Sequence, residues 1–258
     1  MQICDADGGG EIEVRRADRR FVSTRDGITT HHCFSFGEHY DAANVSFGPL
    51  IALNDERLDP GAGYAAHEHR DMDIVTWVLE GTLLREDSTG TRSTIRNGTV
   101  QRLNAGTGVT HSESNGGGPG ETLRFVQLWF ALPSTDAAPS YGTWGFEDDD
   151  DRFGFTTVAS GGPSPSRRAT LSVPGVRVMV GHLDVGTNGA MGTAGRTHRQ
   201  SYLYVASGCM RTRGAGQLTE GDSVRSTGPG LAFTALERTE LLLVELSLVE
   251  LNSSAQGL

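Results

Sequence analysis

Short runs of apolar, β-branched and aromatic residues recur along the whole chain, and polar clusters rich in Gly, Asn, Asp and Pro separate them. Clear runs cover residues 74–79, 123–132, 176–180, 202–205 and 241–246. Short strands with turn signals between them are typical of β-barrels and β-sandwiches, and few segments keep a helical period for about ten residues. The pattern therefore predicts an all-β protein.

The chain changes character between residues 134 and 165, where prolines, an acidic run over residues 147–151 and the segment Gly-Gly-Pro-Ser-Pro replace the apolar runs. We interpret residues 134–165 as a linker between a first barrel domain, residues 1–133, and a second, residues 166–258. The order of glycines and apolar runs before the linker recurs after it. This recurrence indicates either an internal duplication or chance in a chain with 35 glycines.

Composition narrows the functional classes. The formal net charge of the 258 residues is −10, and every basic side chain is Arg. A nucleic-acid-binding protein needs a basic face, so we expect no direct contact with nucleic acid. The most apolar segment, residues 241–251, contains two glutamates, and no N-terminal stretch has the apolar core of a signal peptide. We therefore expect a cytoplasmic protein without a membrane segment.

Two short patterns carry candidate chemistry, His67-Glu68-His69 and His111-Ser112-Glu113. On a β-strand, residues two apart point to the same face, so each pattern would present two ligand groups together. If the two strands are neighbours, His67, His69, His111 and Glu113 converge on one point. Three imidazoles and one carboxylate suit a divalent ion such as Fe, Cu, Ni, Mn or Zn, with positions left open for substrate.

Either pattern alone is a weak signal, and the spacing of the surrounding glycines strengthens it. Residues 61–81 read GAGYAAHEHRDMDIVTWVLEG and residues 98–115 read GTVQRLNAGTGVTHSESN. The first segment resembles the first cupin motif, with Asp73 in place of the usual Glu, and the second segment resembles the second cupin motif. In detail both are similar to pirin patterns, as are REDSTG, HHCFSFGEHYD and LNDERLDPGAGY. The chain is thus identified by resemblance as a member of the pirin family over residues 21–142.

The resemblance implies a bicupin, with two cupin-type β-barrels in tandem and one metal in the first barrel. The family's metal ligands correspond to His67, His69, His111 and Glu113, and the ion implied is iron first, with Cu, Ni, Mn or Zn as alternatives. We expect Asp73 to support this site, through hydrogen bonds to Arg70 or to a ligand imidazole, or else to be a solvated strand residue.

The second half fits a degenerate copy without metal. His111 corresponds there to Phe233 and Glu113 to Ala235. We expect packing or surface roles for the remaining candidates, and for residues 116–120 a flexible turn that could cover the site. These candidates are His31, His32, His39, His182, His198, Cys33 and the acidic run 147–151. Three widely spaced cysteines predict no disulfide framework: Cys4, Cys33 and Cys209.

Two functions are consistent with the resemblance. The first is a metal-dependent dioxygenase of the quercetin 2,3-dioxygenase type, which takes a small aromatic substrate and dioxygen, with Glu113 as the general base. The second is a non-enzymatic redox-sensing regulator that binds a partner protein, and the acidic chain suits a protein partner better than DNA. A pocket large enough for a bicyclic aromatic compound would favour the enzyme.

Overall fold

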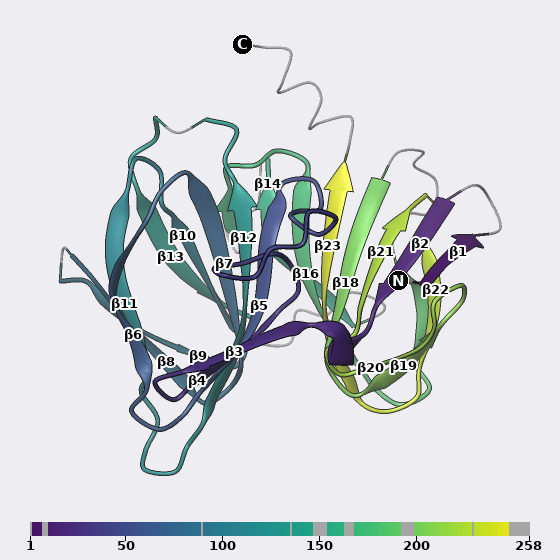
Figure 1. The fold of residues 1–258 in the computed structure, drawn as a ribbon, viewed down its shortest axis with the longest axis horizontal. Helices are drawn as coiled ribbons and strands as arrows, with labels where there is room; N and C mark the ends of the chain where they lie inside the picture. Colours follow the sequence, from purple (N-terminus) through teal and green to yellow (C-terminus); the bar gives the residue numbers. More distant parts are fainter. Residues whose placement is uncertain are drawn as a thin grey trace. The chain divides into compact units, whose positions relative to one another are not determined.

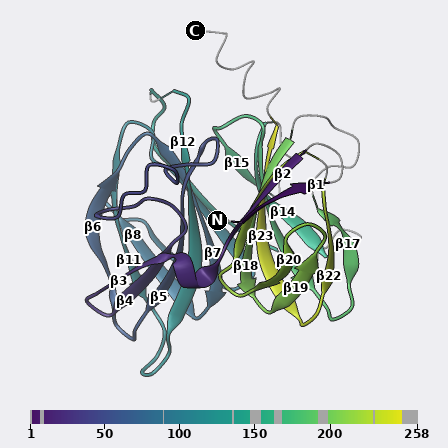
Figure 2. The same ribbon diagram turned by 45° about the vertical axis from the view of Figure 1, so that its right-hand side comes forward.

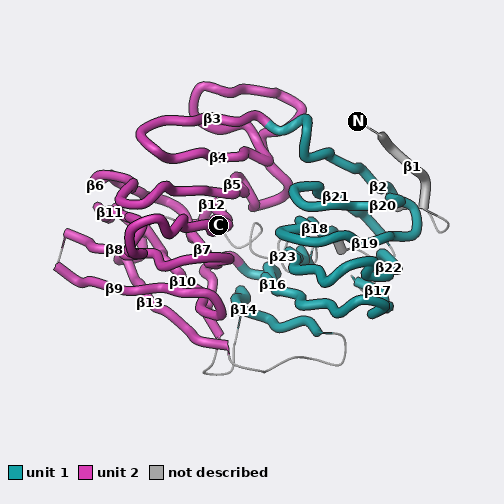
Figure 3. Tube along the Cα trace, turned by 90° about the horizontal axis from the view of Figure 1, so that it is seen from below, with its two compact units in different colours: residues 1–20, 148–164, 174–258 teal, residues 21–147, 165–173 magenta. Residues whose placement is uncertain are grey.

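The computed structural model describes residues 2–6, 10–88, 90–134, 136–146, 154–162, 168–191, 199–228 and 230–247. Regular structure in these ranges is β-strand, apart from the 3-10 turn η1 (Ala17–Arg19). The all-β prediction is therefore confirmed (Figure 1). None of the described segments forms a helix that could cross a membrane. The chain forms two compact units: unit 1 contains residues 1–20, 148–164 and 174–258, and unit 2 contains residues 21–147 and 165–173 (Figure 3).

Unit 2 consists of two antiparallel sheets. In order of neighbours, the larger contains β13 (Ser140–Gly145), β10 (Thr99–Asn104), β7 (Met72–Glu80), β12 (Leu123–Ala131), β5 (Leu50–Leu58), β4 (Ile28–His32) and β3 (Phe21–Arg25). The smaller contains β6 (Gly63–His69), β11 (Val109–Asn115), β8 (Thr82–Asp87) and β9 (Arg92–Arg96) (Figure 1). The short β15 (Ala169–Leu171) also belongs to this unit.

The core of unit 2 lies between its two sheets. Val78 of β7 and Phe125 of β12 pack with Leu83 of β8 and Ile95 of β9 in one buried cluster. Most positions of β7 and β12 are buried, which agrees with their mainly apolar sequences. Each fully buried side chain of this kind contributes about 1.5–3 kcal/mol through the hydrophobic effect. Among the described residues the unit is a two-sheet sandwich and not a closed barrel.

Unit 1 is also built from two antiparallel sheets. The larger contains, in order, β1 (Gln2–Ala6), β2 (Gly10–Arg15), β21 (Ser223–Thr227), β18 (Arg199–Ser207), β23 (Thr239–Ser247), β16 (Val176–Leu183) and β14 (Phe155–Gly161). The smaller contains β17 (Asn188–Met191), β22 (Leu231–Ala235), β19 (Cys209–Thr212) and β20 (Gly216–Thr219), which lie together in Figure 2.

The two units share one strand order, which favours the internal duplication over chance. The smaller sheets run β6-β11-β8-β9 and β17-β22-β19-β20, and the larger sheets share the orders β10-β7-β12-β5 and β21-β18-β23-β16. The strands β5 to β12 of unit 2 thus correspond one by one, in chain order, to the strands β16 to β23 of unit 1. Phe233 and Ala235 lie on β22, the counterpart of β11, as the correspondence with His111 and Glu113 requires.

The division of the chain differs from the one expected from the sequence. The expected linker, residues 134–165, contains β13, which pairs with β10 in unit 2, and β14, which pairs with β16 in unit 1. The N-terminal residues expected in the first domain belong to unit 1, because β2 pairs with β21. Pairing between strands that are distant in the sequence determines which unit a segment belongs to. Local composition does not reveal such pairing.

A buried polar network surrounds Asp73 on β7. The Asp73 carboxylate is fully buried and accepts hydrogen bonds from Arg102 at 2.7 Å, from Asn104 at 3.0 Å and from the backbone N–H of Ser172 at 2.6 Å. These contacts join β7, β10 and the segment that follows β15. Asp73 therefore holds unit 2 together through the larger sheet.

The expected contact between Asp73 and Arg70 is absent, and so is a bond to a ligand imidazole. Arg70 instead pairs with Glu68 at 2.9 Å on the exposed surface. The reason is geometric: Asp73 belongs to the larger sheet, whereas His67, His69 and His111 belong to the smaller one.

Replacing Asp73 by Asn is expected to lower the free energy of unfolding by about 3–5 kcal/mol, because it leaves the Arg102 guanidinium buried without its counter-charge. Urea unfolding followed by circular dichroism measures this loss. The matched control is Asp26→Asn, which breaks the exposed pair with Arg25 and should cost less than about 1 kcal/mol. Equal stability losses in the two variants would contradict the role assigned to Asp73.

Candidate metal centre

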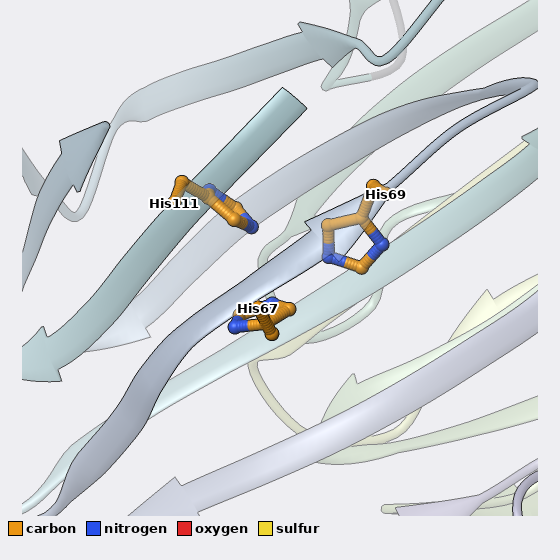
Figure 4. A group of neighbouring side chains, drawn as sticks. All are labelled: His67, His69 and His111. Carbon is orange, nitrogen blue, oxygen red and sulfur yellow. The ribbon is translucent and has the colours of Figure 1, made fainter. Parts of the chain in front are cut away.

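One pair of strands supplies the three histidines. Strand β6 carries His67 and His69, β11 carries His111, and the antiparallel register places His67 directly opposite His111. Residues directly opposite each other in an antiparallel pair project from the same face, as do residues two apart on one strand. All three imidazoles therefore point to one side of the smaller sheet, and Figure 4 shows the three rings grouped together.

Two local features bring β6 and β11 into this arrangement. Gly63 allows the close approach, because a Cβ atom at this position would lie 2.6 Å from the carbonyl oxygen of Glu113. The register then shifts between His111 and Glu113, where the ladder is interrupted. The extra residue is on β6, because Tyr64 pairs with Glu113 while His67 pairs with His111. A β-bulge of this kind lets Tyr64 and His67 face the same side of the sheet although they are three residues apart.

The ligand atoms of His67, His69 and His111 lie within 4.8 Å of one another. The ring centroids are 4.7 Å apart for His67 and His69, 4.7 Å for His67 and His111, and 5.0 Å for His69 and His111. Nitrogens bound to one metal ion at about 2.1 Å must lie within about 4.2 Å of each other, so small rotations of the rings suffice for a common ion. The triad therefore has the dimensions of a metal site.

The hydrogen bonds of the triad leave ring nitrogens free for an ion. The Nδ1–H of His67 donates to the carbonyl oxygen of Ala65 at 2.8 Å, which fixes the tautomer and leaves Nε2 as the lone-pair donor. Both ring nitrogens of His111 are buried and have no hydrogen-bond partner among the described residues. An unpaired buried nitrogen is costly, and coordination of a metal ion removes that cost. The residues present thus fit a divalent cation.

The electrostatic environment keeps two of the three imidazoles neutral. Burial lowers the pKa of His69 to about 4, and the neighbouring His67 and His111 add to this effect. Burial likewise lowers the pKa of His111 to about 3, with smaller contributions from His67 and from the guanidinium of Arg85. Neutral imidazole is the form that binds a metal ion, so both ligands are ready at neutral pH.

Glu113 is buried beside the triad, but the ligand atoms that lie within 4.8 Å of one another are those of the three histidines alone among the described residues. Its carboxylate accepts hydrogen bonds from the side-chain amides of Gln101, at 2.8 Å, and Gln127, at 3.1 Å. The structure thus brings three of the four expected ligands together and holds the fourth on two amides.

The orientation of both amides is fixed by their other partners. The hydroxyl of Tyr141 donates to Gln101 Oε1 at 3.1 Å, and the indole N–H of Trp129 donates to Gln127 Oε1 at 2.7 Å. Each Nε2 is therefore directed at Glu113. Neither glutamine is predicted from the sequence. For Gln127 the available signal is a polar residue inside a mainly apolar run, because a buried amide requires partners; Gln101 lies in a strand with many polar residues and has no such signal.

A cavity of about 750 Å³ opens beside the triad within unit 2. His67, His69 and Glu113 contribute to its wall. Four large aromatic side chains also line it, namely Phe21, Phe36, Tyr64 and Trp129, together with polar side chains. Trp129 packs edge-on against His69 with ring centroids 4.9 Å apart, so the aromatic wall reaches the metal ligands directly. The volume is typical of a site for a ligand the size of a drug or cofactor.

The remaining sequence candidates have structural roles where the structure describes them. His32 and His39 both stack on Phe21, and Cys33 is buried. His182 pairs with Glu240 at 3.4 Å. Residues 116–120 do not contribute to the cavity wall and are held by Asn115 and Glu121. His198 and the acidic run 147–151 lie outside the described residues.

Comparison with known proteins decides the family. The family model described as Pirin matches residues 14–130. A protein of Mycobacterium tuberculosis, provisionally named a quercetin 2,3-dioxygenase, is 38% identical over 236 residues, which cover 91% of this chain and 95% of that protein. The chain belongs to the pirin family. The family assignment made from the motifs is thus confirmed.

Two further pirin relatives bear on the site. The quercetin 2,3-dioxygenase of Escherichia coli is 35% identical over 130 residues, which cover 50% of this chain and 56% of that protein. The crystal structure of the bacterial pirin YhhW from Escherichia coli in complex with nickel(II) matches with a TM-score of 0.82 and 26% identity. That match covers 92% of this chain and 99% of YhhW, so the pirin fold extends over both units.

Nickel(II) is expected to stabilise the metal-free protein against unfolding, by about 2.7 kcal/mol at a free concentration one hundred times its Kd. Thermal unfolding with and without the ion measures this shift. His111→Ala removes one of three ligands and should abolish most of the shift, whereas His182→Ala, which changes a histidine outside the triad, should retain it. A full shift in His111→Ala would show that the ion binds elsewhere.

The two buried imidazoles, His69 and His111, are expected to lower the stability of the metal-free protein as the pH falls from about 7 to about 4. In the unfolded chain each imidazole has a pKa near 6.5, whereas in the folded protein the pKa is about 4 for His69 and about 3 for His111. At these two positions the unfolded state therefore binds more protons over this range, and their contribution to the free energy of unfolding decreases with falling pH.

His69→Gln removes one of these two groups, so its free energy of unfolding should fall less than that of the unaltered protein over the same range. Urea unfolding at several pH values compares the two. Equal losses of stability would contradict a neutral, buried His69.

Proposed function

We propose that this protein is a metal-dependent dioxygenase of the quercetin 2,3-dioxygenase type, which opens a flavonol-like aromatic substrate with dioxygen. The observation that carries this proposal is the coincidence of the histidine triad with an aromatic-walled cavity of about 750 Å³. A flavonol has a fused bicyclic ring system and a pendant ring, and a cavity of this volume has room for it. The names of the relatives from Escherichia coli and Mycobacterium tuberculosis support the same substrate class.

In this proposal His67, His69, His111 and Glu113 hold one divalent ion. Iron is the first candidate, and nickel, copper, manganese and zinc remain alternatives because imidazole and carboxylate ligands suit all of them. The bacterial pirin from Escherichia coli was crystallised with nickel(II), which makes nickel a specific competitor to test. A bound divalent ion would lower the pKa of the flavonol 3-hydroxyl, as it does for bound water, and so prepare the ring for reaction with dioxygen.

The protein residues have separate tasks. Glu113 would accept the proton of the 3-hydroxyl on a carboxylate oxygen, since it lies in the cavity wall and is otherwise bonded to the amides of Gln101 and Gln127. Those two amides orient the carboxylate and stabilise its negative charge. Phe36 and Trp129 would hold the planar rings by stacking and edge contacts and would exclude water from the reacting face.

Quercetin consumption and carbon monoxide release by protein reconstituted separately with each metal test the proposal. Turnover with one metal, lost in His67→Ala and kept in His182→Ala, is the expected result. Absence of turnover from every fully loaded form would contradict the proposed substrate class.

Glu113→Gln is expected to lower turnover by about 100-fold or more, the usual contribution of a general base, while the metal-induced rise in melting temperature largely persists. The amide keeps the shape of the carboxylate but cannot accept the proton. Steady-state kinetics and thermal unfolding on the same sample separate the two effects. Unchanged turnover would remove Glu113 from the role of base.

A further inference from the structure

A second carboxyl group lies in the cavity wall, on Glu56 of β5. Glu56 comes from the larger sheet, whereas the histidine triad comes from the smaller one. Its side chain is buried, with 4% of the residue exposed. Burial of a carboxyl group without an ion-pair partner destabilises the folded protein unless other groups hydrogen-bond to it.

The contacts of Glu56 occupy only one of its two carboxyl oxygens. The hydroxyl of Thr30 donates to Oε2 at 2.5 Å, and the hydroxyl of Tyr64 donates to the same oxygen at 2.7 Å. Within the described part of the chain, Oε1 has no hydrogen-bond partner. Two hydroxyl groups therefore lock the carboxyl group in place and leave one oxygen available to the contents of the cavity.

The other polar side chains in this part of the wall are already paired with one another. Nδ1 of the His32 ring lies 3.1 Å from Asn54 Oδ1, and the Ser23 hydroxyl lies 2.8 Å from His32 Nε2. These two contacts join the three side chains to one another. Glu56 differs from them because its free oxygen is satisfied only by something that enters the cavity.

Burial raises the pKa of Glu56 to about 7, and the nearby charges of Glu113 and Asp55 add to this effect. At neutral pH the carboxyl group is then present both as the acid and as the carboxylate. In the first form Oε1 can donate a hydrogen bond, and in the second it can accept one. A phenolic hydroxyl group is a partner for both forms, because it both donates and accepts.

We propose that Oε1 of Glu56 hydrogen-bonds a phenolic hydroxyl group of the bound ligand, other than the 3-hydroxyl, and that Glu56 thereby selects polyhydroxylated aromatic compounds. The ligand class rests on the proposed function. Glu56 acts in binding and takes no part in the proton transfer assigned to Glu113. A ligand that lacks the hydroxyl would leave the buried oxygen unpaired, and this penalty gives discrimination between otherwise identical ring systems.

The test measures affinities for three flavonols under anaerobic conditions, where no turnover occurs, with metal-loaded protein. The ligands are quercetin, the analogue without hydroxyls on the pendant ring and the analogue without hydroxyls on the fused ring, all with the 3-hydroxyl. Glu56→Ala should weaken quercetin binding by about tenfold or more. For one of the two analogues the same substitution should change the affinity far less, because the hydroxyl that Glu56 binds is already missing.

Comparing ligands within one variant separates recognition from a general loss of structure, because a poorly folded variant would bind all three ligands equally badly. Glu56→Gln keeps a group that can donate and accept, so it should retain most of the preference for quercetin. The matched control is Glu38→Ala, which removes an exposed carboxylate from the rim of the same cavity and should leave the three relative affinities unchanged.

Equal losses for all three ligands in Glu56→Ala, no loss for quercetin, or no binding of any flavonol would overturn the proposal for Glu56. Turnover in air is judged separately. Ligand-specific losses without turnover would support the role of Glu56 and contradict the dioxygenase. Turnover together with equal losses of affinity for all three ligands would support the dioxygenase and contradict the role of Glu56.

Discussion

The site depends on the register of one strand pair, β6 against β11. Because His67 lies directly opposite His111, and His69 is two residues further along the same strand, all three imidazoles leave the sheet on one face. A slip of one residue in β6 would turn His67 and His69 to the opposite face and leave His111 alone. Gly63 permits the close approach of the two strands, and the extra residue in β6 brings Tyr64 opposite Glu113.

Part of this site could be predicted from the sequence because it depends on residues that are close together along the chain. Residues two apart on a strand point to the same face wherever the strand lies. The pattern alone therefore predicts that His67 and His69 point the same way. The pairing of β6 with β11 is non-local, and only the resemblance to pirins indicated it. The amides of Gln101 and Gln127 and the carboxyl group of Glu56 come from β10, β12 and β5, and nothing near these residues in the sequence marks them as neighbours of the site. For the same reason the role of Asp73 and the boundaries of the units were not predictable.

Comparison of the two units shows that the metal-free site lowers the stability of unit 2. They share a strand order, but the positions on β22 that correspond to His111 and Glu113 are Phe233 and Ala235, and both side chains lie in the apolar core of unit 1. Burial of the imidazoles in unit 2 lowers their pKa and leaves the nitrogens of His111 without partners, which opposes folding until an ion binds. Unit 1 has instead the stability that comes from well-packed hydrophobic side chains.

One ion is predicted to bind to the triad in unit 2, next to the aromatic cavity. Anomalous diffraction from crystals of the iron-loaded or nickel-loaded protein tests it directly, because it locates the metal without reference to activity. The account predicts one strong peak bonded to a ring nitrogen of each of His67, His69 and His111, at about 2.0–2.2 Å. A fully loaded protein whose metal peak lies away from these three rings would contradict it.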